Sequence, residues 1–160
     1  MSAAAFDELL RRLTAGEVRF VLIGGLAVNA WGYVRGTKDV DIVPEPGPLN
    51  LRRLAEVAVD AGGHVQTGEI FAGTAASIAA LLSSGEQRII ATSLGRLDVV
   101  QGLPGVPPYA ELAKRAVVVD LLDTTVSVCS LEDLRRMKRA AGRTSDLADL
   151  EGLEDPYPGW

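Results

Sequence analysis

The chain is poor in the side chains that build disulfides and soft-metal sites. Its 160 residues include one cysteine, Cys129, and one histidine, His64. A single cysteine cannot form an internal disulfide, and one thiol with one imidazole does not make up a zinc cluster. The composition therefore argues against zinc and against Cys/His catalysis, and we expect both residues to be structural or incidental.

The chain also lacks a basic excess and a long apolar run. Its net charge of -5 argues against wholesale coating of nucleic acid, so any such contact must come from a local basic patch. No segment approaches the roughly 18 consecutive apolar residues that span a membrane. Charges at Asp7, Glu8, Arg11 and Arg12 stand where a signal peptide needs an apolar stretch. These features predict a cytoplasmic protein without a membrane segment.

What is present fits one globular domain. An apolar content of 48% over 160 residues is enough to bury a core. We expect a single α/β (α+β) domain over residues 1–160, with its core at about 17–130. A C-terminal helical segment is predicted over 131–153, followed by a tail over 154–160.

Hydrophobic periodicity and turn residues predict the order of the elements. Helices are expected over residues 3–14, 26–34, 49–61, 106–116, 131–142 and 143–153. Strands are expected over residues 18–25, 38–43, 87–94, 96–103, 116–122 and 124–130. The stretch 64–85 is small and alanine-rich, and its part 71–85 leaves helix and irregular structure open. Ser130, with Asp133 close to a capping box, is expected to cap one helix, and Thr144 or Ser145 the last.

The segment "KDVDIV" places two carboxylates in an apolar strand. Because side chains alternate along a strand, Asp39 and Asp41 leave the same face and repel each other unless a cation lies between them. Mg²⁺ or Mn²⁺ suits such a pair, since these ions combine carboxylate ligands with water and substrate phosphates. Gly24 and Gly25 precede a helix whose free amides can approach a phosphate. The pattern therefore indicates a site for a nucleotide with its metal.

The order of strand, Gly24–Gly25, short helix and D-x-D strand resembles the nucleotidyltransferase fold of the DNA polymerase β type. The resemblance implies a mixed β-sheet flanked by helices, with a C-terminal helical pair. It also implies that an NTP is the substrate and that a third carboxylate, from a later strand, completes the metal site. Asp98 in "GRLDVV" is the candidate for that catalytic and metal-binding role, beside Asp39 and Asp41. The alternative is an aspartate on a solvated strand face.

Four segments, two of which contain the residues described above, are similar to small prokaryotic nucleotidyltransferases related to the abortive-infection type IV toxins. They are "GGLAVNAWGYVRGTKDVDI", "TSLGRLDVV", "GVPPYAEL" and "SLEDLRRMKRAAGRTSDLADL", and the likeness runs from about Arg19 to Leu153. Those toxins share a Gly-Gly loop, an R-x-T-x-D-x-D strand and a later helix with a lysine before an arginine and an aspartate. The matching positions are Gly24, Gly25, Arg35, Thr37, Asp39, Asp41, Lys138, Arg143 and Asp146.

The resemblance implies roles for these positions around a triphosphate. Lys138 and Arg143 are expected to bind phosphate, because metal ions alone do not neutralise all of its charge. Arg35 and Lys38 either touch phosphate or close the turn, and Thr37 orients the strand entry. Asp146 is expected to support a phosphate ligand rather than touch the substrate, and Asp149 to do the same, unless the two are simply acidic residues at a helix N-terminus.

Several side chains have a plainer interpretation beside the functional one. Arg135, Arg136 and Arg139 belong either to an RNA-binding patch or to a solvated helix face paired with Glu132 and Asp133. For Trp31, we expect a core aromatic behind the glycine loop rather than a base-stacking platform.

The expected activity is Mg²⁺-dependent transfer of an NMP from an NTP, such as ATP, to an acceptor hydroxyl. In the toxin relatives the acceptor is a tRNA 3′ end, so a toxin–antitoxin or phage-defence setting with a cognate toxin or antitoxin partner is expected. Two alternatives stay open. One is an antitoxin-like, protein-modifying or aminoglycoside-type transferase, and the other is a catalytically degenerate nucleotide-binding regulatory module.

Overall fold

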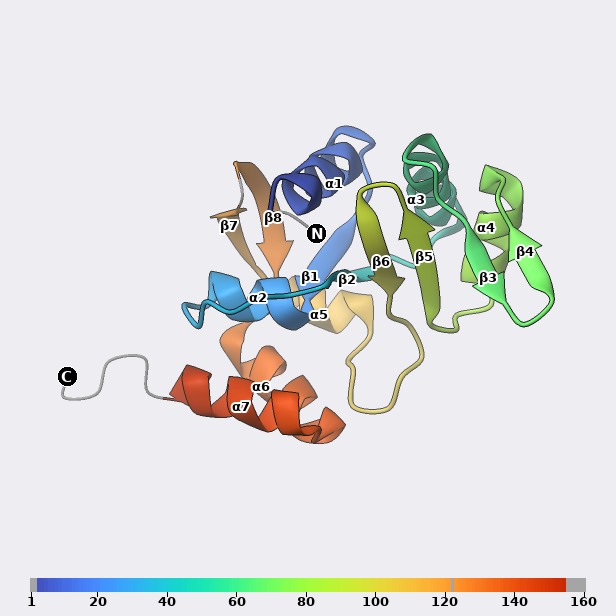
Figure 1. Cartoon of the computed structure of the whole chain (residues 1–160). Coiled ribbons are helices and arrows are strands. Elements are labelled where there is room, and N and C mark those ends of the chain that lie inside the picture. Colours follow the sequence, from blue (N-terminus) through green and yellow to red (C-terminus); the bar gives the residue numbers. More distant parts are fainter. Residues whose placement is uncertain (1–2, 122, 155–160) are drawn as a thin grey trace.

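The computed structural model describes residues 3–121 and 123–154, which form a mixed sheet flanked by helices (Figure 1). The helices are α1 (Ala3–Ala15), α2 (Gly24–Ala30), α3 (Pro48–Asp60), α4 (Ala75–Leu82), α5 (Tyr109–Arg115), α6 (Leu131–Ala141) and α7 (Thr144–Glu154). The strands are β1 (Phe20–Ile23), β2 (Asp39–Pro44), β3 (Val65–Thr67), β4 (Ile70–Ala72), β5 (Arg88–Thr92), β6 (Gly95–Val99), β7 (Val117–Leu121) and β8 (Thr124–Val128). The predicted fold class, including the C-terminal helical pair, is confirmed.

The main sheet contains six strands in the order β5-β6-β2-β1-β8-β7. Strand β1 runs antiparallel to β2 and parallel to β8, while β2 and β6 are parallel. The register between β2 and β6 sets Asp39 opposite Arg96 and Asp41 opposite Asp98. Parallel pairing of two strands that carry aspartates therefore brings residues 57 positions apart in the chain to the same level of the sheet.

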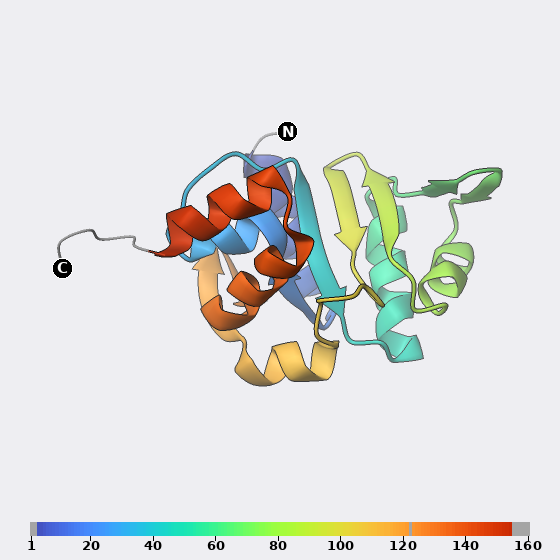
Figure 2. The same cartoon turned by 90° about the horizontal axis from the view of Figure 1, so that it is seen from below.

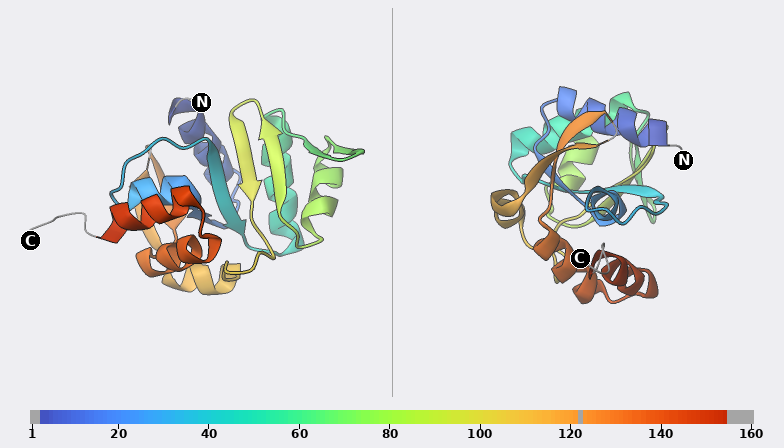
Figure 3. Two further views of the ribbon diagram at one scale, coloured as in Figure 1. Left: turned by 60° about the horizontal axis from the view of Figure 1, so that its bottom comes forward. Right: turned by 90° about the vertical axis from the view of Figure 1, so that its left-hand side faces the viewer.

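Helices cover both sides of this sheet. Figure 3 shows α1 and α3 on one side and the pair α6–α7 beyond the other. The core between α1, α3 and the sheet contains fully buried aliphatic side chains, among them Leu9, Leu13, Leu22, Ile42 and Leu54. Burial of such side chains is the main stabilising term of a domain this size, at about 1.5–3 kcal/mol each. This packing fixes the central strands, and with them the positions of the carboxylates that they carry.

Several elements differ from the expectation. Gly24 and Gly25 begin α2 instead of ending the preceding strand, and α2 ends at Ala30 instead of residue 34. Helix α5 starts three residues later than expected, and β6 ends four residues earlier. The stretch 64–85 forms the hairpin β3–β4 and then α4, whose first turn is closed by a reciprocal cap between Thr74 and Ser77. Figure 2 shows this hairpin and α7 at opposite ends of the molecule.

The C-terminal pair is set by its caps. Ser130 accepts a hydrogen bond from the Asp133 amide at 3.0 Å, as expected, and Gly142 ends α6 in the left-handed conformation (φ 63°). The Asp133 carboxylate does not complete a capping box, because Arg115 holds both of its oxygens at 2.8 and 3.0 Å.

Helix α7 begins one residue earlier than its predicted caps allow. The Arg143 carbonyl accepts from the Leu147 amide at 2.9 Å, so Thr144 and Ser145 lie inside the first turn. Of the predicted tail over 154–160, Glu154 ends α7, and residues 155–160 lie outside the described residues. No helix within the described ranges has the length and apolar character that a membrane crossing requires.

Candidate active site

Three aspartates converge where β2 and β6 run side by side. Asp39 and Asp41 leave the same face of β2, and Asp98 projects from β6 toward them. One carboxylate oxygen from each residue lies within 4.8 Å of the others. The structure thus brings together the three carboxylates that the sequence pointed to, and their catalytic and metal-binding roles stay a prediction.

The electrostatics of the cluster reflect closely spaced negative charges. The pKa of Asp41 is raised to about 7, by burial first and then by the nearby Asp98 and Asp39 carboxylates, against the opposing effect of Lys138. Burial and then Asp98 also raise the pKa of Asp39. A divalent cation bound among the three carboxylates would favour the ionised forms of Asp39 and Asp41. An all-oxygen donor set of this kind fits Mg²⁺ or Mn²⁺ rather than a softer metal.

The glycine pair brings α2 against this cluster. Gly24 has a φ of 69°, and a Cβ at this position would overlap the Asp41 carboxylate, lying 2.7 Å from its Cγ. A Cβ on Gly25 would lie 2.5 Å from Thr37 Oγ1 and 3.1 Å from Arg35 Nη1. Glycine at both positions therefore permits the backbone of α2 to approach Asp41 and the loop before β2.

Lys138 of α6 lies deep in the same region. Its Nζ is 2.9 Å from Asp149 Oδ2 and 3.2 Å from Asp146 Oδ1, and both carboxylates are buried. Burial raises the pKa of each aspartate, but hydrogen bonds outweigh this effect, so both pKa values are lowered. The donors are Arg143 and Lys138 at Asp146, and Arg35 and Lys138 at Asp149. Lys138 is therefore held as an ammonium between two ionised carboxylates.

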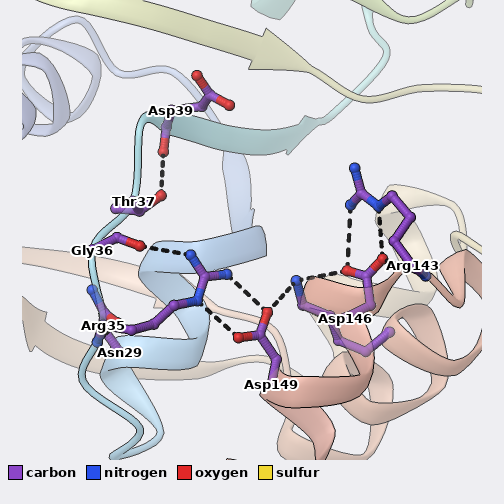
Figure 4. A network of polar contacts seen from close by, with 9 residues as sticks. Asn29, Arg35, Gly36, Thr37, Asp39, Arg143, Asp146 and Asp149 are labelled. Atoms are coloured by element: carbon purple, nitrogen blue, oxygen red, sulfur yellow. Dashed lines mark hydrogen bonds and ion pairs between the residues drawn. The ribbon is translucent and has the colours of Figure 1, made fainter.

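Arg143 and Arg35 bracket this ion-pair network from two sides (Figure 4). Arg143 Nε is 2.7 Å from Asp146 Oδ2, while its side chain is largely exposed. Arg35 donates to both oxygens of Asp149 at 2.8 Å and to the Gly36 carbonyl at 2.8 Å. The expected bracing of Arg143 by Asp146 is present, and Asp149 instead ties α7 to the loop before β2.

The predicted site residues divide into two groups around a cleft of about 380 Å³. Its lining includes Gly24, Asp39, Asp41, Asp98, Lys138, Arg143 and Asp146. Gly25, Arg35, Thr37 and Lys38 are not part of that lining. Arg35 and Thr37 instead support it from behind, since the Thr37 hydroxyl donates to the Asp39 carbonyl at 3.3 Å. The predicted nucleotide-binding role of these residues stays a prediction.

Apolar side chains also line the cleft, together with Gln87. They are Ile23, Val100, Leu103, Val106, Leu134, Met137 and Ala141. No sequence pattern points to these residues as one surface, because they come from strand ends, a loop and a helix.

Arg96 is a further site residue that the sequence analysis missed. Its guanidinium donates to both oxygens of Asp98, at 2.7 and 3.0 Å, and lies 3.6 Å from Asp39. The signal was available, since residues two apart in a strand share a face and Arg96 stands two before Asp98.

The residues with plainer interpretations are accounted for by packing. Trp31 packs against the core and its indole Nε1 donates to the Cys129 carbonyl at 2.9 Å. Cys129 is buried, and burial raises the pKa of its thiol to about 12. His64 stacks on Phe71 with ring centroids 5.3 Å apart. The structure thus places Trp31 and Cys129 in the core and leaves His64 outside the cleft.

The cations of α6 are mostly engaged within the protein. Arg135 donates to the Leu153 carbonyl at 2.6 Å, and Arg136 pairs with Glu132 and Asp133 at 3.5 and 3.6 Å. Arg139 is exposed and makes no hydrogen bond or ion pair within residues 3–121 and 123–154. The solvated-face interpretation therefore holds for Arg136, and the RNA-binding patch stays a prediction.

The chain matches no protein-family model, and its sequence matches no curated protein. Several solved structures share its fold, and three of them are similar along nearly the whole chain. The lincomycin-bound lincosamide antibiotic adenylyltransferase LnuA has a TM-score of 0.68 at 14% identity, over 98% of this chain and 99% of that one. A putative nucleotidyltransferase from Thermotoga maritima has a TM-score of 0.58 at 14% identity, over 95% and 91%. The antibiotic-resistance factor ANT(2'')-Ia has a TM-score of 0.52 at 13% identity, over 97% and 92%.

These likenesses establish the nucleotidyltransferase fold along nearly the whole chain. At identities this low they establish the fold alone. The closer relation to abortive-infection toxins, expected from the sequence motifs, stays a prediction.

Proposed function

We propose that the protein is a nucleotidyltransferase that moves an NMP from an NTP to an acceptor hydroxyl with the help of Mg²⁺ or Mn²⁺. The observation that carries the proposal is the carboxylate cluster, whose oxygens from Asp39, Asp41 and Asp98 lie within 4.8 Å of one another. It stands in a cleft that also contains Lys138 and Arg143. A cleft with acidic metal ligands beside phosphate-binding cations, on this fold, suits a triphosphate substrate.

In this reaction the acceptor oxygen bonds to the α-phosphorus, and pyrophosphate leaves with the electrons of the broken P–O bond. Asp39, Asp41 and Asp98 would hold the metal, which supplies charge neutralisation and Lewis acidity when bound. Asp98, which lies on the strand next to the other two, takes up the acceptor proton. Arg143, largely exposed at the cleft, neutralises phosphate charge, and Lys138 sets the positive potential beneath it.

For the acceptor, the cleft supports a small hydroxyl-bearing molecule with an apolar part. Apolar side chains make up part of its lining, and its carboxylates are paired with cations or expected to hold metal, which leaves little to bind a polycation. Two of the three solved structures carry the names of antibiotic-modifying or antibiotic-resistance proteins. By the same reasoning, the engaged cations of α6 give less support to a tRNA 3′ end, for which the motif resemblance is the argument.

The test is an acceptor panel with purified protein, each of four labelled NTPs, and Mg²⁺ or Mn²⁺. The acceptors are a lincosamide, an aminoglycoside, bulk tRNA and total cellular protein, the last two because the toxin–antitoxin and protein-modifying alternatives remain proposals. We expect transfer to the lincosamide-type acceptor and its loss in Asp41→Asn. The matched control is Asp120→Asn, on edge strand β7, where the carboxylate accepts from Thr125 at 2.9 Å. Absence of transfer to every acceptor, or transfer that survives Asp41→Asn, would overturn the proposal.

A further inference from the structure

Arg96 is the cation in direct contact with the carboxylate cluster. It stands two residues before Asp98 on β6 and opposite Asp39 in the register of β2. Its Nε lies 2.7 Å from Asp98 Oδ1 and its Nη2 3.0 Å from Asp98 Oδ2, so one guanidinium covers both oxygens of that carboxylate. The same Nε lies 3.6 Å from Asp39 Oδ1.

The other cations of the cleft are committed elsewhere. Lys138 forms ion pairs with Asp146 and Asp149, and Arg143 pairs with Asp146. Within the described part of the chain, Arg96 is therefore the cation whose ion pairs reach two of the three clustered aspartates. Its side chain is 48% exposed, so it can leave the carboxylates for solvent without opening the core.

We propose that Arg96 is a resident counter-ion that competes with the divalent cation for the oxygens of Asp98 and Asp39. This inference rests on the proposed function, because it assumes that these carboxylates hold a metal. While no metal is bound, Arg96 positions Asp98 and offsets part of the repulsion within the cluster. A divalent cation gains those oxygens only as the guanidinium leaves them, so its affinity is lowered.

The competition has a consequence for the order of binding. A triphosphate offers anionic oxygens to which the displaced guanidinium can donate, so Arg96 exchanges one ion pair for another. Metal without nucleotide has no such compensation. Metal and nucleotide therefore favour each other's binding, and Arg96 is the residue through which part of that coupling acts.

The test is Mn²⁺ binding, followed by electron paramagnetic resonance of free Mn²⁺, in wild type, Arg96→Gln and Arg96→Lys. Without nucleotide, we expect Arg96→Gln to bind Mn²⁺ at least about tenfold more tightly, since a unit positive charge close to the ion is removed. Arg96→Lys keeps the charge but cannot cover both oxygens, so its affinity should fall between the two. With a non-hydrolysable NTP analogue present, the advantage of Arg96→Gln should shrink.

The control is Arg52→Gln, which removes the same charge from the exposed pair with Glu56 on α3. It should leave Mn²⁺ affinity unchanged. Arg96→Gln with affinity equal to or weaker than wild type would overturn the competition, and an advantage undiminished by the analogue would overturn the coupling. Asp41→Asn distinguishes a failure of the proposed metal site from a failure of the proposed role of Arg96. If wild type binds Mn²⁺ no better than Asp41→Asn does, the metal site itself is wrong, and the role of Arg96 falls with it.

Discussion

Gly24 and Asp41 approach each other so closely that residue 24 has no room for a side chain. A Cβ on Gly24 would lie 2.7 Å from Asp41 Cγ and 2.9 Å from Asp41 Cβ. The φ of Gly24 is 69°, a conformation that L-residues with a side chain rarely adopt. The backbone at the start of α2 and the side chain of Asp41 are thus in direct contact, although the two residues lie 17 positions apart in the chain.

This contact predicts the effect of the smallest substitution at the glycine. In Gly24→Ala, the new methyl group forces either Asp41 or the start of α2 to move. Displacement of a catalytic group by about 1 Å can cost on the order of 100-fold in rate, so we expect at least that loss of nucleotidyl transfer. Mn²⁺ binding should weaken in the same variant, because Asp41 is one of the expected ligands.

Gly32→Ala is the matched control. Gly32 also has a positive φ, 105°, but a Cβ there would meet nothing within 4 Å. Both substitutions therefore carry the backbone cost of about 1–2 kcal/mol, while only Gly24→Ala introduces the clash. Equal losses of transfer in the two variants would show that backbone strain, and not contact with Asp41, is responsible.

The second prediction concerns the attachment of α7. Asp149 is 2% exposed and accepts from Arg35 at 2.8 Å and from Lys138 at 2.9 Å. Asp149→Asn removes the charge that both cations share, and breaking a buried pair from one side costs about 3–5 kcal/mol. Because Arg35 is partly exposed, we expect the lower end of that range in the free energy of unfolding, measured by urea denaturation.

The control for this prediction is Glu132→Gln on the neighbouring helix. Glu132 is 80% exposed and its partner Arg136 lies 3.5 Å away. Exposed pairs contribute at most about 1 kcal/mol, so this variant should unfold close to wild type. If Asp149→Asn were no less stable than Glu132→Gln, the network around Lys138 would not hold the C-terminal pair in place.

Local patterns were enough to predict that Asp39 and Asp41 share one face of β2, because side chains alternate along a strand. Capping residues and helix breakers were enough to locate most elements. Asp98 needed the resemblance, because its position depends on the parallel register of β2 and β6, which no local pattern specifies. The six-stranded mixed sheet itself follows from the same long-range pairing.

The parts that escaped prediction are tertiary. Arg35 and Asp149 lie 114 positions apart, so the sequence could only offer Arg35 as a phosphate ligand or a turn residue. Arg96 was missed although alternation points it toward the cluster, since an arginine in a strand reads as a solvated side chain. The short hairpin β3–β4 was not predicted, because strands of three residues are too brief to show a period.

The third prediction separates phosphate binding from stability. Arg143 is 74% exposed at the cleft, so its guanidinium can reach a ligand from solvent. We expect Arg143→Gln to raise the KM for NTP about tenfold, the usual scale for one charge-assisted contact. Asp146 keeps its ion pair with Lys138 at 3.2 Å, so the loss of stability should be smaller than in Asp149→Asn. Arg139→Gln serves as the control, because Arg139 is an exposed arginine of α6 that does not line the cleft, and it should leave the KM unchanged. A matching rise in both variants would point to general surface charge instead.

The fourth prediction follows from the pKa of Asp41, which burial and the neighbouring Asp98 and Asp39 carboxylates raise from its ordinary 3.8 to about 7. At pH 4 this carboxyl is protonated in the folded chain and about half protonated in the unfolded chain, so the two states differ little. As the pH rises toward 7, the unfolded chain releases the proton first, so the metal-free folded state loses stability, by on the order of 2–4 kcal/mol at pH 8. Asp41→Asn cannot ionise and escapes that loss.

With EDTA present, Asp41→Asn should therefore melt at a higher temperature than wild type at pH 8 and at nearly the same temperature at pH 4. Saturating Mg²⁺ at pH 8 should raise the Tm of wild type and leave Asp41→Asn almost unaffected, because bound metal favours the ionised form. Thermal unfolding followed by circular dichroism at the two pH values measures both effects. A stability difference that is the same at pH 4 and pH 8 would mean that Asp41 ionises normally in the folded protein and that the cluster has no excess charge for a metal to relieve.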